Sequence, residues 1–229
     1  MLPLNLNHFL FLKKIICPPK LSFAVKHFRK KRINVLDIGC GNFSYYLTKK
    51  WLRINHYTGV DKEYWHDEKE SYEGIDDLRF IDLDEPDALD QISNDFYDYI
   101  IFNHVIEHLP EAEDVLKAFL DKLKKGGFIY IETPSLRTIN YPSANGFLNF
   151  YDENTHKRAY PIPYLITIMM SYGFKIKKYG VRRDIKRIII YTFPMLLYNI
   201  FYSIPFKRRL DSRGLWDFLG VSEFLIAYK

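Results

Sequence analysis

A short apolar run that ends in an acid and two glycines constrains the fold of this chain more than any other feature. It occupies residues 33–44 and reads Ile-Asn-Val-Leu-Asp-Ile-Gly-Cys-Gly-Asn-Phe-Ser. Such a run predicts a buried strand, a tight turn whose glycines let the backbone approach a ligand, and a helix that Ser44 caps. The pattern is typical of a nucleotide pocket at the carboxyl edge of a parallel sheet.

Apolar runs alternate with helical patterns along the rest of the chain. We expect strands over 33–38, 56–60, 78–81, 97–102, 128–133, 174–181 and 223–228, and helices over 22–30, 45–52, 112–123 and 163–172. The helix over 112–123 has the clearest periodicity, and we expect Gly126 and Gly127 to end it. Strands that alternate with helices through five units predict an α/β fold with a doubly wound sheet.

Composition and charge limit the domain organisation. With 229 residues, 48% of them hydrophobic, the chain can form one large domain or a domain with an appendage. We expect a basic, helical N-terminal extension over 1–32 and a main domain over 33–229 that contains a hydrophobic insertion at about 184–220. The net charge of +5 is too small to indicate nucleic-acid binding, and two cysteines form no metal or disulfide framework, which fits a reducing cytoplasm.

Acidic residues follow three successive predicted strands. They are Asp37, Asp61 and Asp82. Each alone could cap a helix or lie in a solvated turn, but the carboxyl ends of parallel strands share one edge, so we expect the three to gather there. Asp61 follows Gly39 at the spacing at which an acid reaches ribose hydroxyls, and Asp82 could accept a hydrogen bond from an exocyclic amine.

At this point the chain resembles the class I S-adenosylmethionine-dependent methyltransferases. The segments that carry the resemblance are 35–41, 59–61, 81–86, 103–109 and 126–134, in the order and spacing of that family. The resemblance covers residues 30–182 and extends to 221–229. It implies a Rossmann-like sheet of seven strands, mostly parallel, with an antiparallel last strand.

The resemblance also implies a set of residues that bind S-adenosylmethionine. Gly39, Cys40 and Gly41 would border its methionine part, and Asp37 would contact its amino group directly or through water. The ribose and adenine would lie against Asp61, Asp82 and the amide of Leu83, and Asn103 would lie near the amino-acid end or the methyl group. One position departs from the family pattern, because Phe43 stands where a third glycine is usual.

The chemistry of methyl transfer needs alignment and, for an oxygen or nitrogen acceptor, sometimes a base. The candidate catalytic residues are His108 and His156, with His104 and Glu107 behind them. His108 could instead pack at a helix entry, and His156 could be a loop residue bonded to backbone. We expect a small-molecule, sugar or lipid-linked acceptor, methylated on oxygen and bound by 134–160 and 184–220; no target-base motif for nucleic acid follows the fourth strand.

Three other interpretations compete with this one. The domain could be a non-catalytic binding or scaffold module in which Phe43 obstructs the pocket. The spacing of Gly39, Gly41 and Ser44 nearly fits the fingerprint of NAD(P)-binding oxidoreductases. Residues 104–108 read H-x-x-E-H, a zinc-protease pattern, but Pro110 makes a helix there doubtful, and we expect no metal.

A charge-free segment over 188–206 raises the question of a membrane. Its length would suffice to span a bilayer, but it contains Pro194, Asn199 and Pro205, and basic residues flank both sides. We expect an interfacial or substrate-covering helical insertion, and a buried helical pair is the alternative. The chain would then be cytoplasmic, with contact at the inner face of a membrane through this segment.

Overall fold

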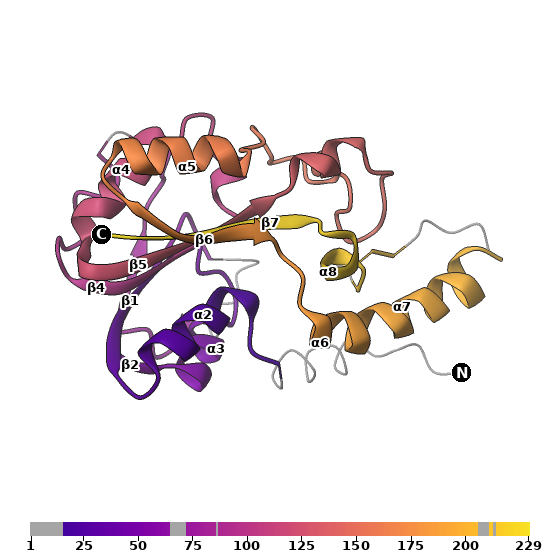
Figure 1. Ribbon diagram of the computed structural model, residues 1–229, viewed down its shortest axis with the longest axis horizontal. Coiled ribbons are helices and arrows are strands. Elements are labelled where there is room, and N and C mark those ends of the chain that lie inside the picture. The colour runs from indigo at the N-terminus through magenta and orange to yellow at the C-terminus, as the bar shows by residue number, and fades with distance from the viewer. Residues whose placement is uncertain (1–15, 65–71, 86, 206–210, 213) are drawn as a thin grey trace.

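The fold is a single seven-stranded sheet between two layers of helices (Figure 1). It is known from a computed structural model that describes residues 16–229 apart from 65–71, 86, 206–210 and 213. The strands are β1 (Arg32–Ile38), β2 (Arg53–Asp61), β3 (Asp77–Phe80), β4 (Tyr97–Asn103), β5 (Leu123–Pro134), β6 (Lys175–Val181) and β7 (Ser222–Tyr228).

The strand order is β3-β2-β1-β4-β5-β7-β6. The pairs β3–β2, β2–β1, β1–β4 and β4–β5 are parallel, and β7 runs antiparallel to both β5 and β6. This confirms the predicted doubly wound, Rossmann-like sheet with an antiparallel last strand. Its parallel strands end at one edge, where the three predicted acids lie.

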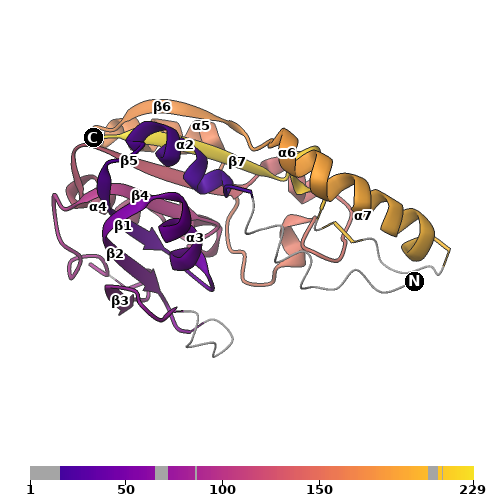
Figure 2. The same ribbon diagram turned by 90° about the horizontal axis from the view of Figure 1, so that it is seen from below.

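Helices cover both faces of the sheet (Figures 1 and 2). The helices α2 (Pro19–Phe28) and α3 (Ser44–Trp51) lie on one face, and α4 (Glu113–Lys122) and α5 (Ile162–Ser171) lie on the other. Successive residues of β1 belong to different cores: Ile33 and Val35 pack with α2, while Leu36 and Ile38 pack in the cluster that contains α4 and α5. Burial on both faces explains why the central strands read as continuous apolar runs.

Two expected helix boundaries were wrong. Gly126 and Gly127 do not end the helix, because β5 already begins at Leu123. A Cβ on Gly127 would lie 2.9 Å from the carbonyl oxygens of Lys124 and Tyr97, so the glycine permits a close approach of β5 to β4. The first described helix begins at Pro19 rather than near residue 22, since a proline needs no hydrogen bond in the first turn.

Ser44 is the first residue of α3 and not its cap. The cap position belongs to Phe43, whose φ of 63° lies in the left-handed region. The Ser44 hydroxyl donates to the carboxylate of Asp37 instead. The turn after β1 is therefore tied to the strand by a side chain and not closed by a capping bond to backbone.

The polar segment 134–160 is compact. It contains the short 3-10 helices η4 (Leu136–Asn140) and η5 (Phe150–Asp152). The Asp152 carboxylate oxygen Oδ2 accepts hydrogen bonds from the backbone N–H groups of Ala144, Leu148 and Asn149 at 2.9–3.1 Å. A single carboxylate oxygen therefore organises the backbone turn over 144–149.

The expected insertion lies between β6 and β7. Its helical stretch runs through α6 (Ile185–Arg187), η6 (Ile188–Thr192), α7 (Phe193–Tyr198) and η7 (Asn199–Ser203), and it projects from the sheet (Figure 2). A short helix, α8 (Trp216–Leu219), precedes β7. Within the described part of the chain, no helix is both long and apolar enough to cross a membrane.

Candidate active site

The glycine turn after β1 is joined to the acid at the end of β2. Asp61 accepts a hydrogen bond from the backbone N–H of Gly41 at 2.8 Å through Oδ2, and from the N–H of Lys62 at 2.9 Å through Oδ1. Burial raises the pKa of Asp61, and the two amides act against that rise. The carboxylate therefore lies at the edge of the sheet in a fixed orientation, as a ribose-binding acid would need to.

The two glycines of this turn have different structural roles. Both have left-handed backbone, with φ of 67° at Gly39 and 50° at Gly41. A Cβ on Gly39 would lie 2.3 Å from Cγ2 of Val105, whereas a Cβ on Gly41 would have no atom within 4 Å. The first glycine thus permits packing against the segment after β4, and the second faces open space where a ligand can approach. Between them, Cys40 is buried, which raises the pKa of its thiol.

Asp37 is fully buried in β1. Its Oδ2 accepts hydrogen bonds from the Tyr57 hydroxyl at 2.6 Å and from the Ser44 hydroxyl, and Lys20 Nζ lies 3.4 Å away. Its Oδ1 is also buried and has no hydrogen-bond partner among the described residues. A buried acceptor without a donor fits the expected amino group of the methyl donor.

The remaining predicted cofactor residues lie on the neighbouring strand ends. Asp82 follows β3 and forms an ion pair with Lys62 at 2.6 Å, which lowers the pKa of its carboxyl. Leu83 packs partly against the core, and Asn103 is the half-buried last residue of β4. These positions surround the same sheet edge as Asp37 and Asp61, so the set fits a nucleoside with an amino-acid tail. Their roles in binding stay predictions.

A cavity of about 320 Å³ lies beyond the end of β4. It is lined by residues from the segment after β4, the polar segment 134–160 and the end of the insertion: His104, Glu107, His108, Pro134, Thr138, Phe147, Leu148, Asn149, Phe150, Glu153, Thr155, His156, Trp216 and Val221. None of the predicted cofactor residues lines it, although His104 directly follows Asn103. The cavity is therefore suited to an acceptor beside the donor site.

The structure brings the two predicted catalytic histidines together. His108 lies at the end of the 3-10 turn η3 (Ile106–His108), His156 lies in the loop before α5, and their ring centroids are 4.9 Å apart. Backbone hydrogen bonds hold the loop in place, since the N–H groups of Lys157 and Arg158 donate to the carbonyl of Glu107 at 2.8 and 3.2 Å. Burial lowers the pKa of His156, so its imidazole is neutral at neutral pH.

The H-x-x-E-H segment does not form the helix that a zinc protease requires. His104 has left-handed backbone with φ of 54°, and only a single 3-10 turn follows it. The His104 ring is instead bonded on both sides by carboxylates, with Nδ1 3.0 Å from Glu107 and Nε2 3.1 Å from Glu132. His104 and His108 therefore do not form a histidine pair on one helix face.

A buried ionic network behind the cavity was not predicted. Arg182 lies 2.6 Å from Glu132 and 3.2 Å from Asp217, which also pairs with Arg187 at 3.0 Å. Burial opposes charge on His104, but its two carboxylate partners outweigh burial and raise its pKa to about 9. Burial likewise opposes charge on Glu132, but Arg182 and His104 keep its pKa well below the usual range. No sequence spacing relates these residues, because they come from distant strands and loops.

Comparisons with known proteins agree with this geometry. A family described as a methyltransferase domain matches residues 7–179, which is more than half of the chain. A search of the curated proteins finds no match.

Solved structures share the fold. A SAM-dependent methyltransferase from Archaeoglobus fulgidus is 20% identical, with a TM-score of 0.57 over 96% of this chain and 99% of that one. An S-adenosylmethionine-dependent methyltransferase from Mesorhizobium loti is 11% identical, with a TM-score of 0.61 over 92% of this chain and 98% of that one. The chain belongs to the methyltransferase domain family, and it is an enzyme that uses S-adenosylmethionine as its methyl donor.

Proposed function

We propose that the enzyme transfers the methyl group of S-adenosylmethionine to an oxygen atom of a lipid-linked acceptor. The acceptor group on the lipid is a small molecule or a sugar. The observation that carries this proposal is the cavity beyond the end of β4, in which the imidazoles of His108 and His156 lie with ring centroids 4.9 Å apart. The bound donor supplies an electrophilic methyl group. The protein must therefore align the acceptor oxygen with that group and provide for removal of the proton from the acceptor hydroxyl.

The polar groups of the cavity support a hydroxyl acceptor. His108 Nδ1 lies 3.2 Å from the carbonyl of Thr155, and His156 Nδ1 lies 2.7 Å from the carbonyl of Phe150. Since a carbonyl can only accept, each Nδ1 carries a proton, and in the neutral form of each ring Nε2 has a lone pair. Both histidines can therefore accept a hydrogen bond from an acceptor hydroxyl.

The size and walls of the cavity support an acceptor of sugar size. Its volume of about 320 Å³ lies at the lower end of the range for small-molecule pockets. Phe147, Phe150 and Trp216 form aromatic walls, while Thr138 and Asn149 add polar groups. A ring that bears several hydroxyl groups matches apolar walls with a few polar contacts.

The helical stretch of the insertion supports a lipid-linked acceptor. Polar side chains on its inner face are hydrogen-bonded to neighbouring backbone. Thr192 donates to the carbonyl of Gly214 at 2.8 Å. Asn199 donates to the carbonyl of Asp211 at 2.8 Å and accepts from the N–H of Asp211 at 2.9 Å. Its outer face is apolar and exposed: Ile185, Ile189, Phe193, Leu196, Leu197, Ile200, Phe201 and Ile204. We call these eight residues the outer face.

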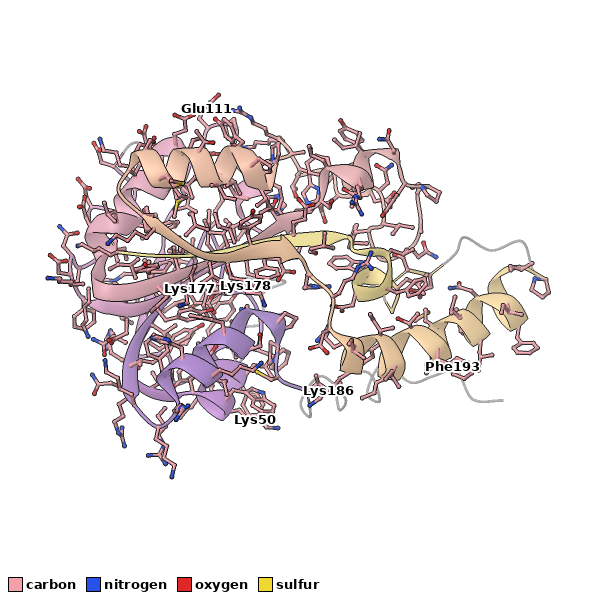
Figure 3. All side chains as sticks on the ribbon, in the orientation of Figure 1. Lys50, Glu111, Lys177, Lys178, Lys186 and Phe193 are labelled. Carbon is pink, nitrogen blue, oxygen red and sulfur yellow. The ribbon has the colours of Figure 1, made fainter. Side chains whose placement is uncertain are left out.

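An apolar face turned outward, with basic residues at its ends, is typical of helices that lie at a membrane surface. Figure 3 shows Phe193 on this stretch and Lys186 near its beginning. Phe193 is 64% exposed, and the sequence places three basic residues at 207–209. We propose that the outer face rests on an anionic membrane and brings the cavity near a lipid-linked substrate.

Transfer of a labelled methyl group tests the acceptor class. The enzyme is incubated with S-adenosylmethionine carrying a labelled methyl and with either lipid-linked sugars or water-soluble sugars, and the product linkage is identified by mass spectrometry. We expect label in an O-methyl group of the lipid-linked fraction. Label on nitrogen, or label confined to protein or nucleic acid, would refute the proposal.

Vesicle binding tests the membrane contact separately. We expect the enzyme to co-sediment with vesicles that contain phosphatidylglycerol, and the double variant Phe193→Glu with Phe201→Glu to lose most of that binding. The matched control changes Met170 and Tyr179 to Glu, since both are exposed apolar residues outside the insertion. Equal binding of both double variants would rule out the outer face as the contact.

A further inference from the structure

Three metal-ligating side chains meet on the wall of the acceptor cavity. Glu107, His108 and His156 each offer one ligand atom, and these atoms lie within 4.8 Å of one another. All three residues line the cavity. The turn η3 carries the first two, and the loop before α5 carries the third.

The backbone around this cluster keeps it together. The carbonyl of Glu107 accepts hydrogen bonds from the N–H groups of Lys157 and Arg158, so the residues directly after His156 are fixed to the residue directly before His108. The rings of His156 and Phe150 also pack, with centroids 4.6 Å apart. The loop thus holds His156 opposite η3.

Both imidazoles are oriented as metal ligands are. A metal-bound histidine usually donates its other ring N–H to a carbonyl or carboxylate, which fixes the ring and leaves the free nitrogen for the metal. Here the Nδ1 atoms of His108 and His156 each lie within hydrogen-bond distance of a backbone carbonyl. The Nε2 atom of each ring is the one left for an ion.

The carboxylate of Glu107 completes the donor set. It is fully buried, with Oε1 accepting from His104 at 3.0 Å and Oε2 accepting from Thr133 at 3.3 Å. Each carboxylate oxygen has a second lone pair, so these bonds leave room for one metal bond. Because His104 and Thr133 share this carboxylate, we expect an exchangeable ion and not a permanently bound one.

We propose that Glu107, His108 and His156 bind a divalent first-row transition-metal ion in the acceptor cavity. Two imidazoles and one carboxylate suit such ions and leave further coordination positions open. Ligands at about 2.1 Å from an ion lie at most ~4.2 Å apart, so small rotations of the two half-buried histidines close the site. Among the described residues, this cluster places two imidazoles and a carboxylate beside a cavity in which a substrate could bind the same ion.

The proposed ion gives the cavity a role in the chemistry, and this part rests on the proposed function. An acceptor hydroxyl bound to the ion would lose its proton to solvent water, since a bound cation lowers the pKa of a coordinated O–H. The oxygen would then form the C–O bond as the C–S bond of the sulfonium breaks, with the electron pair passing to sulfur. The products are the methyl ether and S-adenosylhomocysteine, whose sulfur is uncharged.

Direct binding of metal tests the site without any acceptor. Protein dialysed against chelator is titrated with Mn²⁺, followed by electron paramagnetic resonance, and with Zn²⁺, followed by calorimetry. We expect one ion of at least one of these metals per chain with micromolar affinity, and a loss of tenfold or more in His108→Gln and in His156→Gln. His27→Gln is the control, since His27 is exposed on α2. No binding of either ion by folded wild-type protein would overturn the proposal.

A chelator separates the metal from direct base catalysis. With an acceptor in hand, we expect chelator to abolish methyl transfer and Mn²⁺ or Zn²⁺ to restore it, while calorimetric binding of S-adenosylmethionine is unchanged. Full transfer in chelator, lost in the histidine variants, would show that the imidazoles act directly and would overturn the role of the ion. Metal binding without transfer to any oxygen acceptor would support the site and refute the proposed function.

Discussion

The amino group of Lys20 lies 3.4 Å from Oδ2 of Asp37 and 2.6 Å from the hydroxyl oxygen of Ser44. Lys20 belongs to α2, which precedes β1 in the sequence, so this helix supplies a cation to the acid that we expect to bind the amino group of the donor. Asp37 is fully buried, and a buried carboxylate without a cation is costly. Lys20 therefore compensates the charge of Asp37 at the place where we expect the ammonium group of S-adenosylmethionine.

Replacement of this cation is the first prediction. We expect Lys20→Met to lower the free energy of unfolding of the ligand-free enzyme by about 1–3 kcal/mol, because it leaves the Asp37 carboxylate without its cation. We also expect S-adenosylmethionine to bind several-fold more tightly, because its ammonium group no longer shares the Asp37 carboxylate with the cation of Lys20. Urea unfolding and calorimetric titration measure the two effects.

Lys26→Met is the matched control, because Lys26 lies exposed on the same helix. It should change neither stability nor affinity measurably. Weaker binding of the donor by Lys20→Met would contradict the prediction and would indicate that Lys20 contacts the carboxylate of the donor.

The acid at the end of β2 carries the second prediction. We expect Asp61→Asn to weaken binding of S-adenosylmethionine and S-adenosylhomocysteine by tenfold or more, because an amide offers one acceptor oxygen where two ribose hydroxyls need two. The amide oxygen can still accept from the Gly41 N–H, so the turn should stay folded. Calorimetry measures the affinity, and Asp90→Asn, at an exposed acid, is the control. Unchanged affinity would exclude Asp61 as the ribose ligand.

Much of the fold was predictable from the sequence because it depends on local patterns. Buried parallel strands need continuous apolar runs, and the runs at 33–38 and 97–102 became β1 and β4 almost residue for residue. The turn after β1 was harder, since we expected Ser44 to cap a helix. The serine hydroxyl bonds Asp37 instead, and that choice depends on Lys20 and Tyr57, which no local pattern connects to the turn.

The residues of the candidate site were predictable only where a polar side chain directly follows a predicted strand. Asp61 could be placed at the sheet edge because it directly follows a strand. His156 was a candidate, but its position opposite His108 depends on the carbonyl of Glu107, which holds the loop through backbone hydrogen bonds. Arg182 directly follows β6 and pairs with Glu132 of β5 across β7, which lies between these two strands. The pairing therefore depends on the assembled sheet and has no sequence signal.

The third prediction concerns the backbone at Phe43. This residue is left-handed and 47% exposed, so its side chain gains little from burial while its backbone is strained. We expect Phe43→Gly to raise the free energy of unfolding by about 0.5–1 kcal/mol, the relief of strain less the entropy that glycine loses. Donor affinity should change little, which would argue against Phe43 as an obstruction.

Tyr46→Gly is the contrasting control, because it changes an exposed aromatic residue inside α3 where the backbone is right-handed. It should lower stability by about 1 kcal/mol. Urea unfolding compares the two variants. If Phe43→Gly also lowered stability, contacts of the ring would outweigh the backbone strain.

The last prediction follows from His104, whose pKa is raised to about 9 between the carboxylates of Glu107 and Glu132. In the unfolded chain a histidine titrates near pH 6.5. Between these values the folded state binds a proton that the unfolded state does not, so stability is fully present below about pH 6.5 and falls as pH rises through about 9. We expect the free energy of unfolding to fall by about 2 kcal/mol from pH 6.5 to 8.0.

Urea unfolding across that interval measures the slope, and His104→Asn is the variant that identifies its source. Asparagine tolerates the left-handed backbone at this position, whose φ is 54°, and it does not titrate. The carboxyl of Glu132 has a lowered pKa in the folded protein, so it is ionised in both the folded and the unfolded state throughout the interval. It therefore adds no slope. We therefore expect the fall to disappear in His104→Asn, at lower stability overall. The lowered pKa values of His156 and His27 leave only a small rise in stability just above pH 6.5. A slope equal to that of the wild type would assign the pH dependence to other groups, and His104 would then be neutral in the folded enzyme.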